Sequence, residues 1–379
     1  MAPDLQPAIL VGPGELLQAE LDARVWSQKD LAEIVGRPTQ VINEIVRGTK
    51  QITPETSIQL GEAFGMSPEF WLNHDTAYRL VLALRQPRPN DVALRSRLYG
   101  LVPVAELSRR GWLQRTSTLA ELSAAICEFL GIARPEDEPE VPIARLRRSI
   151  TRTPESRSKI AWIRRAQLLV EEVSVSRFDG RTFKAQIGKI FELARSPDGI
   201  LEVPDFLARL GVRLVFVPHL PRTYLDGATF WDDDGPVVVL TLRYDRLDYF
   251  WFTLGHELVH VLRRDKAGVI DEQSTDDPEE QAANLQASNW MIDPSALDDF
   301  LKSTQGRPNR GQIEAFAGAI ERHPSIVVGR LQHDHVLTWA QLRDMHVGVR
   351  DGLGQLIDRS PDHSLGHSES LPKSAAAGF

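Results

Sequence analysis

The chain has 379 residues, a formal net charge of −8, 42% hydrophobic and 25% charged residues, and a single cysteine, Cys127. This length exceeds one ordinary hydrophobic core, so we expect two or three domains. No apolar stretch is long enough to cross a bilayer, and the N-terminus lacks a signal-peptide core. One cysteine excludes an intrachain disulfide. We therefore expect a cytoplasmic protein that does not enter a membrane. The acidic charge argues against a general nucleic-acid coat protein, although a local basic face can still bind DNA.

Residues 15–80 are predicted to form a compact bundle of short helices, preceded by an N-terminal arm over residues 1–14. A capping box at Ser27 opens a helix over Lys29–Val35, and a second helix runs from Pro38 to Gly48. A glycine turn joins them. Two short helices joined in this way are typical of the helix-turn-helix motif.

The second of these helices exposes a polar and basic face. Amide side chains pair with adenine edges in the major groove, and Arg and Lys contact guanine or phosphate. The predicted DNA contacts are Arg37, Thr39, Gln40, Asn43, Arg47 and Lys50. Gln40 and Asn43 are the candidates for base contacts. Acidic residues on the same two helices leave open a second interpretation, a dimerisation or partner-binding module.

Residues 81–200 are mostly helical by pattern and are predicted to form a helical connector region. An acidic, proline-rich loop over residues 134–142 interrupts them. The sequence leaves open whether this region links two domains, forms a dimer interface or contributes to a substrate cleft.

The chain changes character after residue 200. Apolar, β-branched runs over residues 212–217, 224–231 and 237–242 predict a small β-sheet. Helices follow over residues 296–345, including His335–Met345. Residues 349–379 are polar and are predicted to form a disordered tail.

A metal-binding motif lies within this second half. His256-Glu257-Leu258-Val259-His260 places two imidazoles one helical turn apart on the same face, inside an apolar helix. Neutral imidazole suits Zn²⁺, and Glu280 on a second helix supplies a third ligand. Asn284 follows Glu280 by one turn and is predicted to support the ligands. Glu257 is the predicted catalytic base, which takes a proton from a water at the open position. A helix with two surface histidines is the alternative, but it does not explain the apolar surroundings.

Both halves resemble known families. Residues 15–80 resemble the HigA-type antitoxin branch of the XRE family of helix-turn-helix regulators, through Trp26-Ser-Gln-Lys-Asp-Leu-Ala, Ile42-Asn-Glu-Ile, Thr53-Pro-Glu-Thr and Ser67-Pro-Glu-Phe-Trp-Leu. Residues 205–335 resemble the ImmA/IrrE metallopeptidases, through Asp248-Tyr-Phe-Trp-Phe-Thr-Leu-Gly-His-Glu-Leu-Val-His, Glu280-Gln-Ala-Ala-Asn and Ile326-Val-Val-Gly-Arg-Leu-Gln. One departure follows Glu280, where Gln286 and Asp293 stand at positions that are usually apolar.

The resemblance implies a multidomain protein, mainly α with an α+β part: a helix-turn-helix bundle, a helical middle region, and a zincin-like (gluzincin) peptidase domain over residues 201–348. It implies His256, His260 and Glu280 as zinc ligands and Glu257 as the general base of a metalloendopeptidase. It also implies an operator DNA, a protein substrate or a toxin as partners. A homodimer is expected from operator symmetry alone.

Three hypotheses follow for the function of the second half. It hydrolyses a protein partner or repressor; it only senses or binds a partner, within a non-catalytic antitoxin and autorepressor; or it cleaves its own linker near Arg145–Lys159. A peptidase also needs a donor for the oxyanion of the transition state. His323, Tyr224 and Arg243 are the candidates, which the sequence does not rank.

Overall fold

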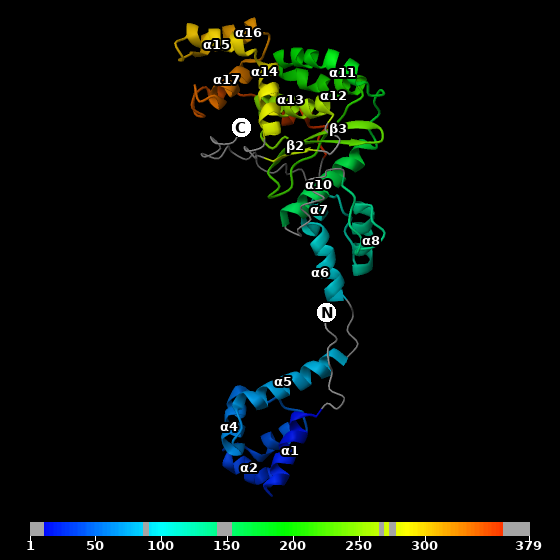
Figure 1. Ribbon diagram of the computed structural model, residues 1–379, viewed down its shortest axis with the longest axis vertical. Helices are drawn as coiled ribbons and strands as arrows, with labels where there is room; N and C mark the ends of the chain where they lie inside the picture. Colours follow the sequence, from blue (N-terminus) through cyan, green and yellow to red (C-terminus); the bar gives the residue numbers. More distant parts are fainter. Residues whose placement is uncertain (1–10, 86–90, 142–153, 265–268, 273–277, 359–379) are drawn as a thin grey trace. The chain divides into compact units, whose positions relative to one another are not determined.

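The computed structural model describes residues 11–85, 91–141, 154–264, 269–272 and 278–358 (Figure 1). The chain divides into two compact units, within residues 1–90 and 91–379. In the described parts of the chain, no helix is both long and apolar enough to span a membrane.

In its described part, the N-terminal unit is a helical bundle. Its helices are α1 (Pro13–Ala23), α2 (Gln28–Ile34), α3 (Thr39–Val46), α4 (Pro54–Phe64) and α5 (Pro68–Arg85). The predicted capping box is present, because Ser27 accepts from the backbone N–H of Asp30 and the Asp30 carboxylate accepts from that of Ser27. Gly36 has a φ of +64° in the turn between α2 and α3, a conformation that glycine adopts without strain.

The helices of this unit pack around one small core. Its fully buried side chains are Leu17, Leu21, Leu31, Ile42, Ile45, Leu60 and Trp71. Gly14 of α1 lies directly against α3, since a Cβ at this position would be 2.0 Å from the carbonyl oxygen of Val46. The core therefore fixes α3 by its apolar side and leaves its polar side outward.

The second unit begins with helices and continues into a four-stranded sheet. The first helices are α6 (Asp91–Leu101), α7 (Val104–Arg109), α8 (Leu119–Leu130), α10 (Pro154–Val170), α11 (Gly180–Gln186), η1 (Ile187–Arg195), η2 (Pro197–Glu202) and α12 (Val203–Arg209). The strands are β1 (Arg213–Phe216), β2 (Leu225–Asp232), β3 (Gly235–Leu240) and β4 (Val269–Glu272), in the order β1-β3-β2-β4. β1 runs parallel to β3, and the other pairs are antiparallel.

Further helices come after strand β3, and the first of them precedes β4 and packs on the sheet. They are α13 (Leu247–Arg263), α14 (Pro278–Met291), α15 (Pro294–Ser303), α16 (Arg310–Ala319), α17 (Pro324–His333), η3 (Arg343–Met345) and α18 (Arg350–Leu353). α13 packs on β2 and lies between the sheet and α14 (Figure 1). The predicted fold class, a helical N-terminal bundle followed by helices and a small sheet, is confirmed at this level.

Both faces of the sheet are buried, because alternate residues of a strand point to opposite sides. Leu214 and Val238 face a core built on α13, whereas Val215 and Val239 face a core built on α10. Helices therefore lie on both sides of the sheet.

The middle region belongs to the second of these cores. Trp162 of α10 is fully buried and donates its indole N–H to the carbonyl of Val217 at 2.9 Å. Arg110 donates to the carbonyls of Pro218 and His219, both at 2.8 Å. The packing thus joins α7 and α10 to the sheet, and the division into units falls after Asn90, inside the connector expected over residues 81–200.

Two sequence expectations are corrected by the structure. Residues 349–358 are folded rather than part of a disordered tail, because Asp245 accepts from the backbone N–H of Val349 at 2.7 Å and Ile357 is buried. His335–Met345 is not a helix, since only η3 is helical there. The rest of the expected tail, and residues 145–153 of the proposed self-cleavage segment, lie outside the described residues.

A buried polar network holds the beginning of α13. The carboxylate of Asp248 accepts from Nε of Arg246 at 3.0 Å and from its Nη2 at 2.6 Å, and lies 3.4 Å from Nδ1 of His346. Burial acts to raise the pKa of Asp248, but the hydrogen bonds and charges of these two partners hold it below its usual value. Gln332 accepts from His346 at 3.0 Å and extends the network to α17.

We expect Asp248→Asn to lower the stability of the second unit by about 3 kcal/mol, because it leaves the buried guanidinium of Arg246 without a compensating charge. Denaturant unfolding followed by tryptophan fluorescence measures the loss. The control is Asp298→Asn, whose carboxylate pairs with Lys302 but is 61% exposed, and which should cost less than about 1 kcal/mol. Equal effects of the two variants would contradict the role given to the network.

Candidate functional site

The HExxH motif lies in the middle of α13, in the most deeply buried part of that helix. The apolar residues before it pack into the core, among them Trp251 and Leu254, which are fully buried. His256, Glu257 and His260 are themselves buried. Glu280 lies in the first turn of α14, and its carboxylate faces the two imidazoles from the neighbouring helix.

These three side chains bring their donor atoms together. Nε2 of His256 lies 3.0 Å from Nε2 of His260. Oε2 of Glu280 lies 3.2 Å from the first of these nitrogens and 3.5 Å from the second. Among the residues that the structure describes, this is the one group of three or more His, Cys, Asp or Glu side chains whose donor atoms converge closely enough for a metal ion.

The spacing of these atoms fits a zinc ion. Ligand bonds of about 2.0–2.1 Å in tetrahedral geometry separate neighbouring donor atoms by about 3.3 Å. The three separations above lie around that value. Two imidazoles and one carboxylate are also the donor set of many catalytic zinc sites, which leave a fourth position open.

Asn284 fixes the orientation of one imidazole. Its side-chain carbonyl oxygen lies 2.7 Å from Nδ1 of His256. An amide oxygen can only accept, so Nδ1 of His256 donates its proton to Asn284. The side chain of Asn284 thus lies against the edge of the His256 imidazole opposite to the one that faces Glu280.

The negative charge of the Glu280 carboxylate also favours binding of a cation between the three side chains. Burial acts to raise the pKa of Glu280, but hydrogen bonds and charge interactions with His256 and His260 hold it well below its usual range. The carboxylate is therefore ionised at neutral pH and available as a ligand.

Glu257 points toward strand β2 of the sheet, in which the sequence predicts no functional residue. Thr229 of β2 is fully buried and donates its hydroxyl to Oε2 of Glu257 at 2.6 Å. Gly227, two residues earlier on the same face, leaves the space for this carboxylate, since a Cβ there would lie 2.5 Å from Oε1. A polar residue between the apolar residues Ala228 and Phe230 is the one sequence signal for Thr229. Both are positioning residues for Glu257.

The three candidates for a transition-state donor do not lie together: His323 is at the start of α17, whereas Arg243 and Tyr224 are neighbours. His323 caps α17 by accepting from the N–H of Ser325 at 3.1 Å, which gives it a structural role. Arg243 is buried 3.9 Å from Asp226, which precedes Gly227, and its guanidinium lies 5.3 Å from the ring of Tyr224. Tyr224 and Arg243 therefore lie at the same end of β2 as Glu257.

The N-terminal unit presents the predicted DNA-contact residues on and beside α3. Thr39, Gln40, Arg47 and Lys50 are exposed, and Arg37 and Asn43 are half-buried. Some are held by neighbours: Asn43 donates to Gln28 at 3.1 Å, and Gln40 donates to Glu44 at 3.0 Å. Gln28, in the first turn of α2, was missed in the sequence analysis, although it fixes the side chain of a predicted base contact.

Comparison with known proteins identifies this N-terminal unit. The profile of the helix-turn-helix family matches residues 17–71, from α1 into α5. The chain is 39% identical over 74 residues to virulence-associated protein I of Dichelobacter nodosus, a likeness that covers 19% of this chain and 68% of that protein. The chain belongs to the helix-turn-helix family.

Two further proteins resemble part of this chain over a similar length. An uncharacterised HTH-type transcriptional regulator of Escherichia coli strain K12, YddM, is 31% identical over 71 residues, which cover 19% of this chain and 76% of that one. The solved structure of an addiction module antidote protein of a HigA family from Coxiella burnetii is 38% identical, over 20% of this chain and 84% of that chain, with a TM-score of 0.20.

The contact between Gly227 and Glu257 can be tested without any ligand. We expect Gly227→Ala to cost about 1–3 kcal/mol of stability, because the added methyl group forces the Glu257 side chain to move. In a Glu257→Ala background the obstacle is absent, so the same substitution should cost clearly less. Denaturant unfolding of the four proteins measures both costs, and additive effects would show that Gly227 does not position Glu257.

Proposed function

We propose that this helix-turn-helix protein is a DNA-binding transcriptional regulator, of the antitoxin-like HigA type, whose second unit is a zinc-dependent peptidase of the ImmA/IrrE kind with a zincin-like fold. The first unit binds an operator as one half of a homodimer. The second unit hydrolyses a protein partner, either a repressor or a toxin.

One observation carries the peptidase proposal. Two imidazoles and a carboxylate converge in a buried site, with an ionised third ligand and with Glu257 next to them on the same helix. A structural ion pair needs only two groups of opposite charge. Three metal-type donors with tetrahedral spacing, and a further carboxylate held beside them, support a catalytic centre.

The side chains divide the work in the following way. His256, His260 and Glu280 would hold zinc, which when bound polarises a scissile carbonyl and lowers the pKa of a water. Glu257 takes the proton of the attacking water and passes it to the leaving amine. Thr229 orients the carboxylate of Glu257 through its hydroxyl, and Asn284 keeps His256 in the tautomer that leaves Nε2 available.

A second candidate function has a specific observation in its favour. Glu257 is 0% exposed and its carboxylate already accepts a short hydrogen bond from Thr229. If Glu257 serves only as a buried hydrogen-bond partner, it has no catalytic role. This arrangement suits a non-catalytic regulator, in which the second unit binds or senses a partner without turnover. The two functions make different predictions for substitution of Glu257.

Metal content and cleavage together test the peptidase proposal. Wild-type protein should hold about one zinc per chain by elemental mass spectrometry, and Glu280→Ala should hold less, because one ligand is lost. Glu257→Gln should retain zinc, because the ligands are intact, yet should lose cleavage of a proteome-derived peptide library read by mass spectrometry.

The outcomes separate the candidate functions. Cleavage that persists in Glu257→Gln would contradict the role of this residue as base. Zinc in the wild type without any cleavage would favour the non-catalytic regulator. No zinc in the wild type would remove the metal centre itself.

DNA binding is tested by anisotropy titrations of palindromic segments from upstream of the gene, at several salt concentrations. Gln40→Ala and Asn43→Ala should reduce discrimination against a scrambled site, by about 1–3 kcal/mol for each bidentate contact that is lost. Arg47→Ala and Lys50→Ala should weaken both sites and reduce the salt slope by about 0.9 each. Arg195→Ala, a 72% exposed arginine of the second unit, is the matched control and should change neither quantity. Unchanged binding in all four of these variants, in α3 and just after it, would show that another surface contacts DNA.

A further inference from the structure

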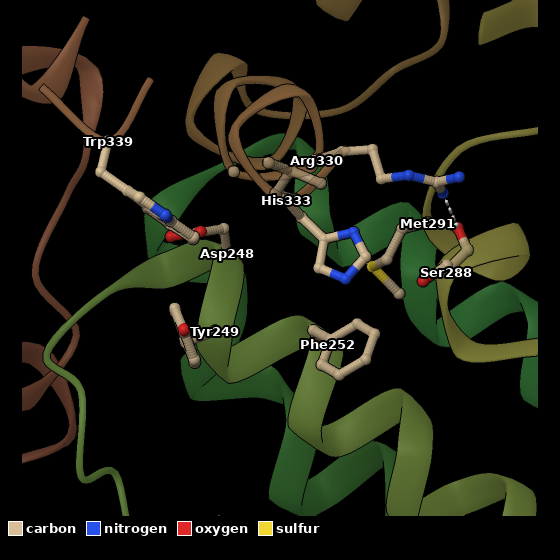
Figure 2. Close-up of a pocket in the computed structure, with 10 residues that line it drawn as sticks. Asp248, Tyr249, Phe252, Ser288, Met291, Arg330, His333 and Trp339 are labelled. Atoms are coloured by element: carbon tan, nitrogen blue, oxygen red, sulfur yellow. Dashed lines mark hydrogen bonds between the residues drawn. The ribbon is translucent and has the colours of Figure 1, made fainter. Parts of the chain in front are cut away.

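A second feature of the catalytic unit is a pocket at the other end of α13 (Figure 2). Its cavity volume is about 70 Å³. Figure 2 shows Tyr249 and Phe252 on α13, Met291 on α14, His333 on α17, and Trp339 on the segment after α17, arranged around this space. The wall is completed by Asp248, Ser288, Ile326, Gly329 and Arg330.

This pocket and the candidate metal centre lie on the same face of α13 and on the same face of α14. The residues on each face form a stripe along the helix. On α13, Tyr249, Phe252, His256 and His260 follow one another at intervals of three, four and four residues. On α14, Glu280, Asn284, Ser288 and Met291 are spaced by four, four and three. Residues at these intervals lie on one face of a helix. The stripes face each other, since His256 contacts Asn284 and Glu280.

The pocket therefore lies one helical turn from the centre, on the same faces of α13 and α14. Phe252 precedes His256 by four residues, which corresponds to about 6 Å along the helix axis. An extended peptide advances about 3.3 Å per residue, so the pocket is within about two residues of a scissile bond at the metal centre.

The lining selects an uncharged, apolar occupant. Three aromatic rings, Met291 and Ile326 supply most of the wall. The two charged residues there are compensated within the protein: Asp248 by Arg246 at 2.6 Å, and Arg330 by Asp334 at 2.7 Å. A charged side chain would lose its hydration without finding a free countercharge, whereas an aromatic ring gains contact with other rings.

We infer that this pocket is the specificity site of the second unit and that it receives an aromatic side chain of the protein substrate, close to the bond that is cut. The inference rests on the proposed peptidase function for the cut, but the recognition of the side chain can be measured without catalysis.

The test uses the full chain and two small probes, N-acetyl-phenylalaninamide and N-acetyl-aspartamide, with binding followed by ligand-observed NMR. The aromatic probe should bind and the acidic one should not. Ser288→Phe places a ring in the pocket and should weaken binding of the aromatic probe about tenfold or more. Leu285→Phe, on the same helix but 61% exposed and outside the lining, is the matched control and should bind as wild type does.

A second variant keeps the test decisive if Ser288→Phe fails to fold. Trp339→Ala removes an aromatic side chain of the pocket that comes from the segment after α17, and should also weaken binding of the aromatic probe. Thermal melting checks that each variant is folded. In the peptide-library experiment, the wild-type cleavage sites should carry Phe, Tyr or Trp within two residues of the cut, and Trp339→Ala should lose that preference.

Failure of the inference and failure of the proposed function give different results. Cleavage without an aromatic preference, or equal binding of both probes, overturns the inference and leaves the peptidase standing. Selective binding that both pocket variants lose, without any cleavage, supports the aromatic site and removes the peptidase. Binding that persists in Ser288→Phe and in Trp339→Ala places the probe elsewhere and also overturns the inference.

Discussion

The close packing of α13 against α14 is the contact on which the candidate site depends. A Cβ at Gly255 would lie 3.4 Å from that of Ala287, so the two helices approach with little between them at this point. One turn away, this approach lets Asn284 reach Nδ1 of His256 and lets Glu280 reach both imidazoles. Strand β2 supports the opposite side of α13. Any change that separated the helices by an ångström or two would disperse donor atoms that now lie 3.0–3.5 Å apart.

Burial makes this arrangement costly unless every polar group has a partner. Transfer of an ionised carboxylate into a protein interior is unfavourable by several kcal/mol without compensation. Here Glu280 is compensated by two imidazoles and Glu257 by the hydroxyl of Thr229. An apolar core of the same volume would be at least as stable. A divalent cation between the three donors would offset the desolvation of the carboxylate.

The sequence predicted what depends on local spacing and missed what depends on distant strands and helices. The capping box at Ser27, the helix of the HExxH motif and the helix of Glu280 all follow from intervals of three or four residues, and all three are present. Thr229 and Gly227 were missed because their role depends on how β2 lies against α13, which no local pattern encodes. The fold of residues 349–358 was missed for a related reason. Its apolar residues are few, and they are held by Asp245, about a hundred positions earlier in the chain.

The polar network at the beginning of α13 gives the aromatic pocket a rigid shape. Asp248 forms part of the pocket wall and is tied to Arg246 and His346, and Gln332 extends the same network to α17. Arg246 in turn lies 5.3 Å from the ring of Tyr249 and 5.5 Å from that of Trp339, so it holds two aromatic walls at once. A pocket whose walls are fixed before binding loses little entropy when it is filled. The interactions that fix the beginning of α13 thus also hold the walls of the neighbouring pocket.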